Sequence, residues 1–90
     1  VESKAARPVK LAPSMQPEGK REQRLLGDVI RLERKRLGVS QEDFAELCDV
    51  HRTYVSQIER GLINISLVNM LRVAKAFQVK PSVLLAKAGL

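Results

Sequence analysis

The chain has 90 residues, a length that allows one small domain of about 60 to 70 residues plus a tail and excludes two domains. It contains no run of about 18 apolar residues and no signal-like segment, so we expect neither a membrane span nor export, and predict a cytoplasmic protein. The formal net charge of +6 favours an anionic partner, but residues 25–65 hold six basic and seven acidic residues, so nucleic-acid binding must be argued from individual faces.

The first segment of the chain has a composition that is typical of disorder. Residues 1–21 contain Pro8, Pro13 and Pro17 without a sustained apolar period. Such a segment buries too little apolar surface to offset the entropy that ordering costs. We therefore predict a flexible N-terminal arm over residues 1–21 and one domain over residues 22–90.

Three helices are predicted in the first half of that domain. Apolar residues recur three and four apart from about residue 22 to residue 38, with Leu26, Ile30 and Leu37 on the inner stripe. Ser40 followed by Asp43 resembles a capping box and starts a second helix, which ends near residue 48. A third helix follows over about residues 52–60, and the glycine at position 61 ends it.

Two further helices complete the domain and make the predicted fold all-α. Ser66 is expected to cap a fourth helix, in which apolar residues recur three and four apart at Leu67, Met70, Leu71, Ala74 and Phe77. Pro81 suits the first position of a short fifth helix that ends near residue 89.

The inventory of reactive side chains argues against an enzyme. No Ser, His and Asp set and no Gly-rich phosphate loop can be assembled, so we expect no catalytic residues and no cofactor. Cys48 and His51 have no companions at metal-ligand spacing, and we expect no metal site. Because Cys48 lies within an apolar period, it is expected to be a small buried side chain.

The third helix has two faces of different chemistry. Its apolar face is expected to hold the helix in place, whereas its polar face offers hydrogen-bonding groups of several lengths: Arg52, Thr53, Ser56 and Gln57. Two short helices joined by a turn of three or four residues form a helix-turn-helix, whose second helix enters the major groove of DNA. Arg binds guanine in a bidentate manner, Gln binds adenine and the Thr methyl meets the thymine methyl. The polar face therefore predicts contact with base edges and phosphates.

The segment SQEDFAELCDVHRTYVSQIERG, residues 40–61, resembles the signature of the phage-repressor and Cro class, often called the Xre family. The segments IRLERKRLGV and ISLVNMLRVAKAFQV are similar to the first and fourth helices of that family, so the resemblance covers residues 25 to about 86. It implies a compact five-helix lambda-repressor-like domain with the motif at residues 40–59. It also implies a transcription regulator that binds double-stranded DNA at a roughly palindromic operator as a homodimer.

The resemblance also implies roles for single residues. It places three side chains where base-reading residues stand: Arg52, Thr53 and Gln57. It places six others at phosphate-contacting or supporting positions: Ser40, Gln41, His51, Tyr54, Ser56 and Arg60. Arg34 and Glu59 match a pair that forms a salt bridge between the first and third helices. Such a bridge orients the reading helix more than it stabilises the fold.

The sequence departs from the family pattern at four positions. Asp49 replaces the usual turn glycine, His51 the usual Ser or Thr cap, and Ile65 a frequent proline. Glu33 replaces an apolar residue, and we expect Leu32 to take over its packing.

A second hypothesis stays open beside DNA binding. The near-neutral middle segment is compatible with a protein-interaction module on the same scaffold, such as an antitoxin-like partner or a coactivator. The two hypotheses differ in salt dependence, because binding to phosphates weakens steeply as salt rises.

Overall fold

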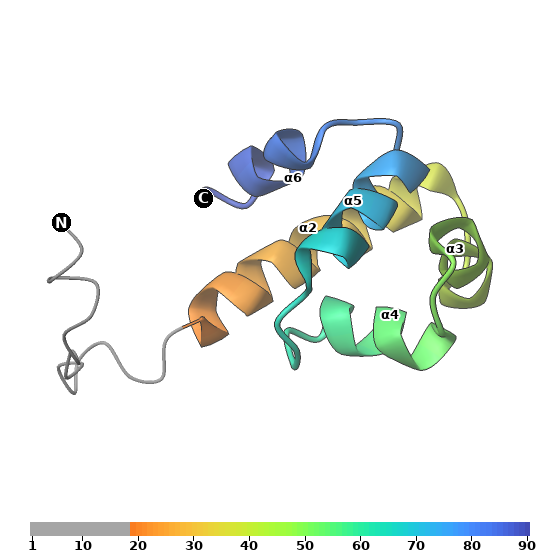
Figure 1. Cartoon of the computed structure of the whole chain (residues 1–90), viewed down its shortest axis with the longest axis horizontal. Helices are drawn as coiled ribbons and strands as arrows, with labels where there is room; N and C mark the ends of the chain where they lie inside the picture. Colours follow the sequence, from red (N-terminus) through yellow and green to blue (C-terminus); the bar gives the residue numbers. More distant parts are fainter. Residues whose placement is uncertain (1–18) are drawn as a thin grey trace, which may run out of the picture.

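Five helices follow one another along residues 19–90, the part of the chain that the computed structural model describes. They are α2 (Lys20–Leu37), α3 (Gln41–Cys48), α4 (Arg52–Glu59), α5 (Leu67–Ala76) and α6 (Pro81–Lys87) (Figure 1). The all-α prediction is confirmed, and within residues 19–90 no helix has both the length and the apolar character needed to cross a membrane. The predicted flexible arm lies outside the described residues, except for its last three, and α2 begins at Lys20 rather than at residue 22.

Side chains at the helix boundaries explain where α3 and α5 begin. The Ser40 hydroxyl accepts a hydrogen bond of 3.0 Å from the amide of Asp43, and the Ser66 hydroxyl accepts one of 3.1 Å from the amide of Asn69. Each bond satisfies an amide that has no partner inside the helix. Both predicted N-caps are therefore present.

The turn between α3 and α4 passes through a left-handed residue. Asp49 has φ 57° and ψ 48°, and its amide donates to the carbonyl groups of Ala45 and Glu46. Asp is one of the few residues with a side chain that adopt this conformation without a large penalty. The turn therefore forms with Asp49 in the place of the usual glycine.

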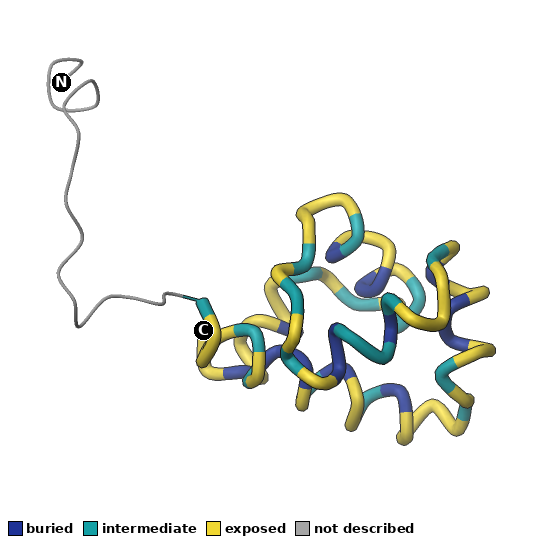
Figure 2. Tube along the Cα trace, turned by 90° about the horizontal axis from the view of Figure 1, so that it is seen from below, coloured by how far each residue is buried: buried dark blue, intermediate teal, exposed yellow. Residues whose placement is uncertain are grey.

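The core lies where the inner faces of the five helices meet, and each helix carries buried residues on one side (Figure 2). Phe44 of α3 is completely buried, and its ring stacks on that of Phe77 with centroids 4.8 Å apart. The largest other fully buried side chains come one from each of the five helices: Ile30, Val55, Val73, Leu84 and Cys48. The predicted burial of Cys48 is thus confirmed.

Two predictions for the apolar face of α2 are wrong. Leu37, the last residue of α2, is exposed. Leu32 is 54% exposed and does not take over packing at Glu33. The Glu33 carboxylate instead accepts hydrogen bonds from Arg36, at 2.8 Å, and from Lys87 of α6, at 3.2 Å. An ion pair thus joins α2 to α6 where an apolar contact was expected.

The predicted inner stripe of α5 is also partly wrong. Met70, Ala74 and Phe77 pack inward, but Leu67 and Leu71 are exposed. Val73, outside the predicted stripe, is buried in their place. The buried face of α5 is therefore rotated about the helix axis from the expected one, which leaves two leucines on the surface.

Candidate nucleic-acid interface

The helix α4 lies at one edge of the molecule and packs against α2 and α3 (Figure 1). Val55, Ile58 and Glu59 form its buried side. The residues predicted to read bases lie on its other sides, where Arg52 and Thr53 are exposed and Gln57 is half-buried. The polar groups that the sequence singles out are thus available to a partner, while the apolar residues hold the helix.

The start of α4 has free amide groups next to these side chains. His51 occupies the N-cap position, but its side chain makes no cap hydrogen bond. Its carbonyl oxygen accepts from the amides of Tyr54, at 3.0 Å, and Val55, at 3.2 Å. The first amides of a helix have no partner within it and attract anions. This end of α4 therefore suits a phosphate group.

The supporting residues lie around the same edge. Ser40 and His51 are exposed at the starts of α3 and α4, and Arg60 is exposed at the end of α4. Ser56 is half-buried, and Tyr54 is half-buried with its ring packed against the core. Five positions from both helices of the motif thus lie around the side chains that were predicted to read bases.

A buried ion pair fixes α4 against α2. The Arg34 guanidinium donates from Nε to Glu59 Oε2 at 2.6 Å and from Nη2 to Glu59 Oε1 at 3.0 Å. The Arg34 side chain is 11% exposed and the Glu59 side chain 2%. The hydrogen bond with Glu59 raises the pKa of Arg34 above its ordinary value, although burial acts in the opposite direction. The structure thus brings together the two residues that the resemblance matched to a salt bridge.

Two more hydrogen bonds extend this pair into a network. Arg34 Nη1 donates to the carbonyl oxygen of Val39 at 2.9 Å, and Gln41 Nε2 donates to Glu59 Oε1 at 3.0 Å. The network therefore joins α2, the connection to α3, the first turn of α3 and the last turn of α4. Charge-assisted bidentate bonds of this kind have strict geometry, so they restrict the angle at which α4 leaves the protein.

Two glycines bring the backbone of α2 close to the end of α4; position 61 was predicted only to end the third helix, and no role was predicted for position 27. A Cβ atom at Gly27 would lie 2.3 Å from the carbonyl oxygen of Ile58, far inside van der Waals contact. A Cβ atom at Gly61, which has φ 70°, would lie 2.8 Å from Cα of Arg24. The only sequence signal was a glycine in the interior of a predicted helix, which often has a packing reason.

Comparison with known proteins connects this geometry to a family. The sequence model of the helix-turn-helix family matches residues 30–84, which include α3, the turn and α4. The chain belongs to the helix-turn-helix family. The predicted Xre-type resemblance is confirmed, and this family consists of DNA-binding transcription regulators, not enzymes.

Several relatives of this helix-turn-helix protein are controller proteins. The chain is 47% identical over 62 residues to the control protein C.BamHI of Bacillus amyloliquefaciens, covering 68% of this chain and 76% of that protein. It is 35% identical over 66 residues to the control protein C.SmaI of Serratia marcescens, covering 73% and 79%. The crystal structure of the restriction-modification controller protein C.AhdI from Aeromonas hydrophila matches with a TM-score of 0.68 and 40% identity, over 70% of this chain and 96% of that chain.

Proposed function

We propose that this protein is a sequence-specific transcription regulator that binds a roughly palindromic operator as a homodimer, with α4 of each protomer in a major groove. The observation that carries the proposal is the orientation of α4, whose apolar side is buried while Arg52 and Thr53 are exposed. Two-fold symmetry would separate the half-sites by one helical turn, about 34 Å. A regulator of the phage-repressor class binds its operator in the cytoplasm, so we expect this protein there.

The proposed contacts divide by reach and chemistry. Arg52, Thr53 and Gln57 read base edges, because they stand on the outer side of α4 and carry the donors and the methyl group that suit bases. Six residues contact phosphates or support these contacts: Ser40, Gln41, His51, Tyr54, Ser56 and Arg60. The amide nitrogen of Gln41 uses one hydrogen on Glu59 and keeps a second for a phosphate oxygen.

The relatives suggest which genes the regulator acts on. C.BamHI and C.SmaI are control proteins, and C.AhdI is a restriction-modification controller. The identity to these proteins supports a role for this chain in controlling restriction-modification genes. Binding to DNA that lies upstream of such genes, in preference to unrelated DNA, is the expected result.

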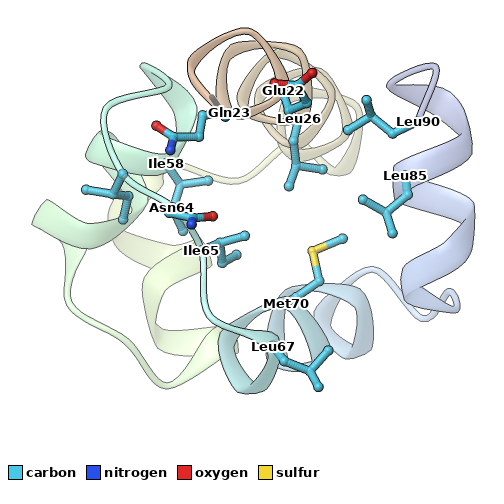
Figure 3. A pocket seen from close by; sticks show the side chains of 12 residues that line it. Glu22, Gln23, Leu26, Ile58, Asn64, Ile65, Leu67, Met70, Leu85 and Leu90 are labelled. Carbon is cyan, nitrogen blue, oxygen red and sulfur yellow. The ribbon is translucent and has the colours of Figure 1, made fainter. Parts of the chain in front are cut away.

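An apolar hollow of about 350 Å³ supports the homodimer. Leu26, Met70 and Leu85 point into it from three helices (Figure 3), and the exposed Leu67 also lines it. Ile58 in the last turn of α4 belongs to the same lining, so the hollow adjoins one end of the recognition helix. Contiguous exposed apolar surface of this kind is typical of interfaces.

Dimerisation through the hollow predicts a result in solution. Leu67 is 74% exposed, so Leu67→Glu should leave the fold intact while placing a carboxylate in the interface. Analytical ultracentrifugation should show a dimer for the wild type and a monomer for the variant. The matched change is Leu47→Glu at an exposed position of α3, and it should leave the dimer intact. A dimeric Leu67→Glu variant would place the interface elsewhere.

The proposed reading face is tested by two substitutions on α4. Arg52→Ala and Gln57→Ala should each weaken binding to the selected operator by about 1 to 3 kcal/mol and leave nonspecific affinity nearly unchanged. The operator would first be selected from a random DNA pool, which also reports its symmetry. Full discrimination between operator and scrambled DNA in both variants would show that other residues read the bases. A wild type that binds no DNA at low salt would instead favour the protein-interaction module.

A further inference from the structure

Three exposed basic residues form a row along α2: Arg24, Arg31 and Lys35. They are seven and four residues apart, which corresponds to about two turns and one turn of an α-helix, so they lie on one side of α2. The exposed Asp28 lies on the same side, so these four residues together carry a net charge of +2. At about 1.5 Å per residue the row is about 17 Å long. We call the three basic residues the α2 row.

The position of the α2 row around the helix axis follows from the contacts of α2 with α4. Gly27 and Arg34 mark the side of α2 that touches α4. With about 100° per residue, Arg31 lies about 40° from Gly27 in one direction, while the fully buried Ile30 lies about 60° from it in the other. The α2 row is therefore on the side of the α2–α4 contact that is away from the core.

The outer side of α4 continues this surface. Glu59 faces α2, and Ser56 and Arg60 follow it around α4 by about 60° and 100° toward the exposed side. The close approach of Gly61 to the backbone of Arg24 joins the two helices at the end of α4. The exposed faces of α2 and α4 thus form one surface beside the base-reading side chains.

We propose that the α2 row contacts the phosphate backbone that borders the major groove occupied by α4. The proposal rests on the proposed function, because it extends the same DNA interface onto α2. Guanidinium groups bind phosphate in a bidentate manner, and each DNA strand carries one phosphate per 3.4 Å of helix axis, so the row is long enough to reach more than one phosphate of a strand. On the opposite flank of α4, the exposed residues of α3 include Glu42, Asp43 and Glu46, which repel phosphates. The helix that contacts the DNA phosphate backbone along its length is therefore α2 and not α3.

The test measures how affinity depends on salt. Affinity for a random-sequence duplex is measured from about 50 to 200 mM salt for the wild type and for Arg24→Gln/Arg31→Gln. Each lost phosphate contact lowers the slope of log affinity against log salt by about 0.9, so a bound dimer that loses four contacts should lose about 3.6. The control, Lys75→Gln/Lys80→Gln, removes the same charge from exposed residues at the end of α5 and before α6, and should keep the wild-type slope.

The outcomes separate this proposal from the proposed function. A wild type without DNA binding would overturn both. If the wild type shows a steep slope and Arg24→Gln/Arg31→Gln keeps it, only the proposal for the α2 row is overturned. The same holds if the control variant lowers the slope as much as Arg24→Gln/Arg31→Gln does. If Arg24→Gln/Arg31→Gln loses its helical circular dichroism, Arg31→Gln/Lys35→Gln takes its place with the same expected loss.

Discussion

Glu59→Gln should destabilise the protein strongly, because it removes the charge that balances a buried guanidinium. The variant keeps one side-chain oxygen, but its new NH₂ group would face donors, since Arg34 and Gln41 both donate to Glu59. Breaking one partner of a buried pair costs about 3 to 5 kcal/mol. A folded unit of this size has a free energy of unfolding of about 4 to 11 kcal/mol, so the variant should be marginally folded.

The measurement is thermal or urea unfolding followed by circular dichroism. For a domain of this size each kcal/mol lowers Tm by about 4 to 8 °C, so a loss of 3 kcal/mol corresponds to at least about 12 °C. Glu33→Gln is the matched control, because Glu33 pairs with exposed Arg36 and Lys87 and such pairs contribute at most about 1 kcal/mol. Equal Tm changes in the two variants would refute the assignment of the buried pair.

Two other substitutions test the packing of α2 and α3. Gly27→Ala should lower the free energy of unfolding by about 1 to 3 kcal/mol, because the new Cβ would overlap the Ile58 carbonyl oxygen, even though alanine favours helices. The control is Asp28→Ala at an exposed position of the same helix, and a stabilised Gly27→Ala would contradict the close approach. Burial raises the pKa of Cys48 from 9.0 to about 11, so the thiol contributes stability below pH 9 that is lost as pH rises to 11. This loss amounts to about 3 kcal/mol in urea titrations and should be absent from Cys48→Ala. Identical alkaline profiles would mean that the thiol ionises freely in the folded state.

The helix-turn-helix could be predicted from the sequence because its signals are local. Serine caps at residues 40 and 66 and a turn glycine at residue 61 set helix ends within a few residues of the chain. The alternation of polar and apolar residues in α4 gave the orientation of the helix by the same short-range logic. Such patterns survive in any tertiary context that buries one face of each helix.

The errors arose where a distant segment decides burial. A leucine at helical spacing marks a face, but whether that face is covered depends on how far α6 extends over α2 and how α5 is rotated. Leu32 and Leu67 therefore looked like core residues and are exposed. Glu33 and Lys87, 54 residues apart, form an ion pair that no local pattern could indicate. The Arg34–Glu59 pair came from the family resemblance and not from spacing.

The geometry of α4 makes the contacts at its C-terminal end important for specificity as well as for stability. The helix has eight residues and is about 12 Å long, so a tilt of about 10° about its last turn moves its first turn by about 2 Å. That shift exceeds the tolerance of a bidentate hydrogen bond to a base. Gly27 and Arg34 of α2 contact the last turn, whereas Arg52 stands in the first. A substitution at Gly27 that leaves the protein folded should therefore reduce discrimination between operator and scrambled DNA, because the reading side chains are aimed from the opposite end of their helix.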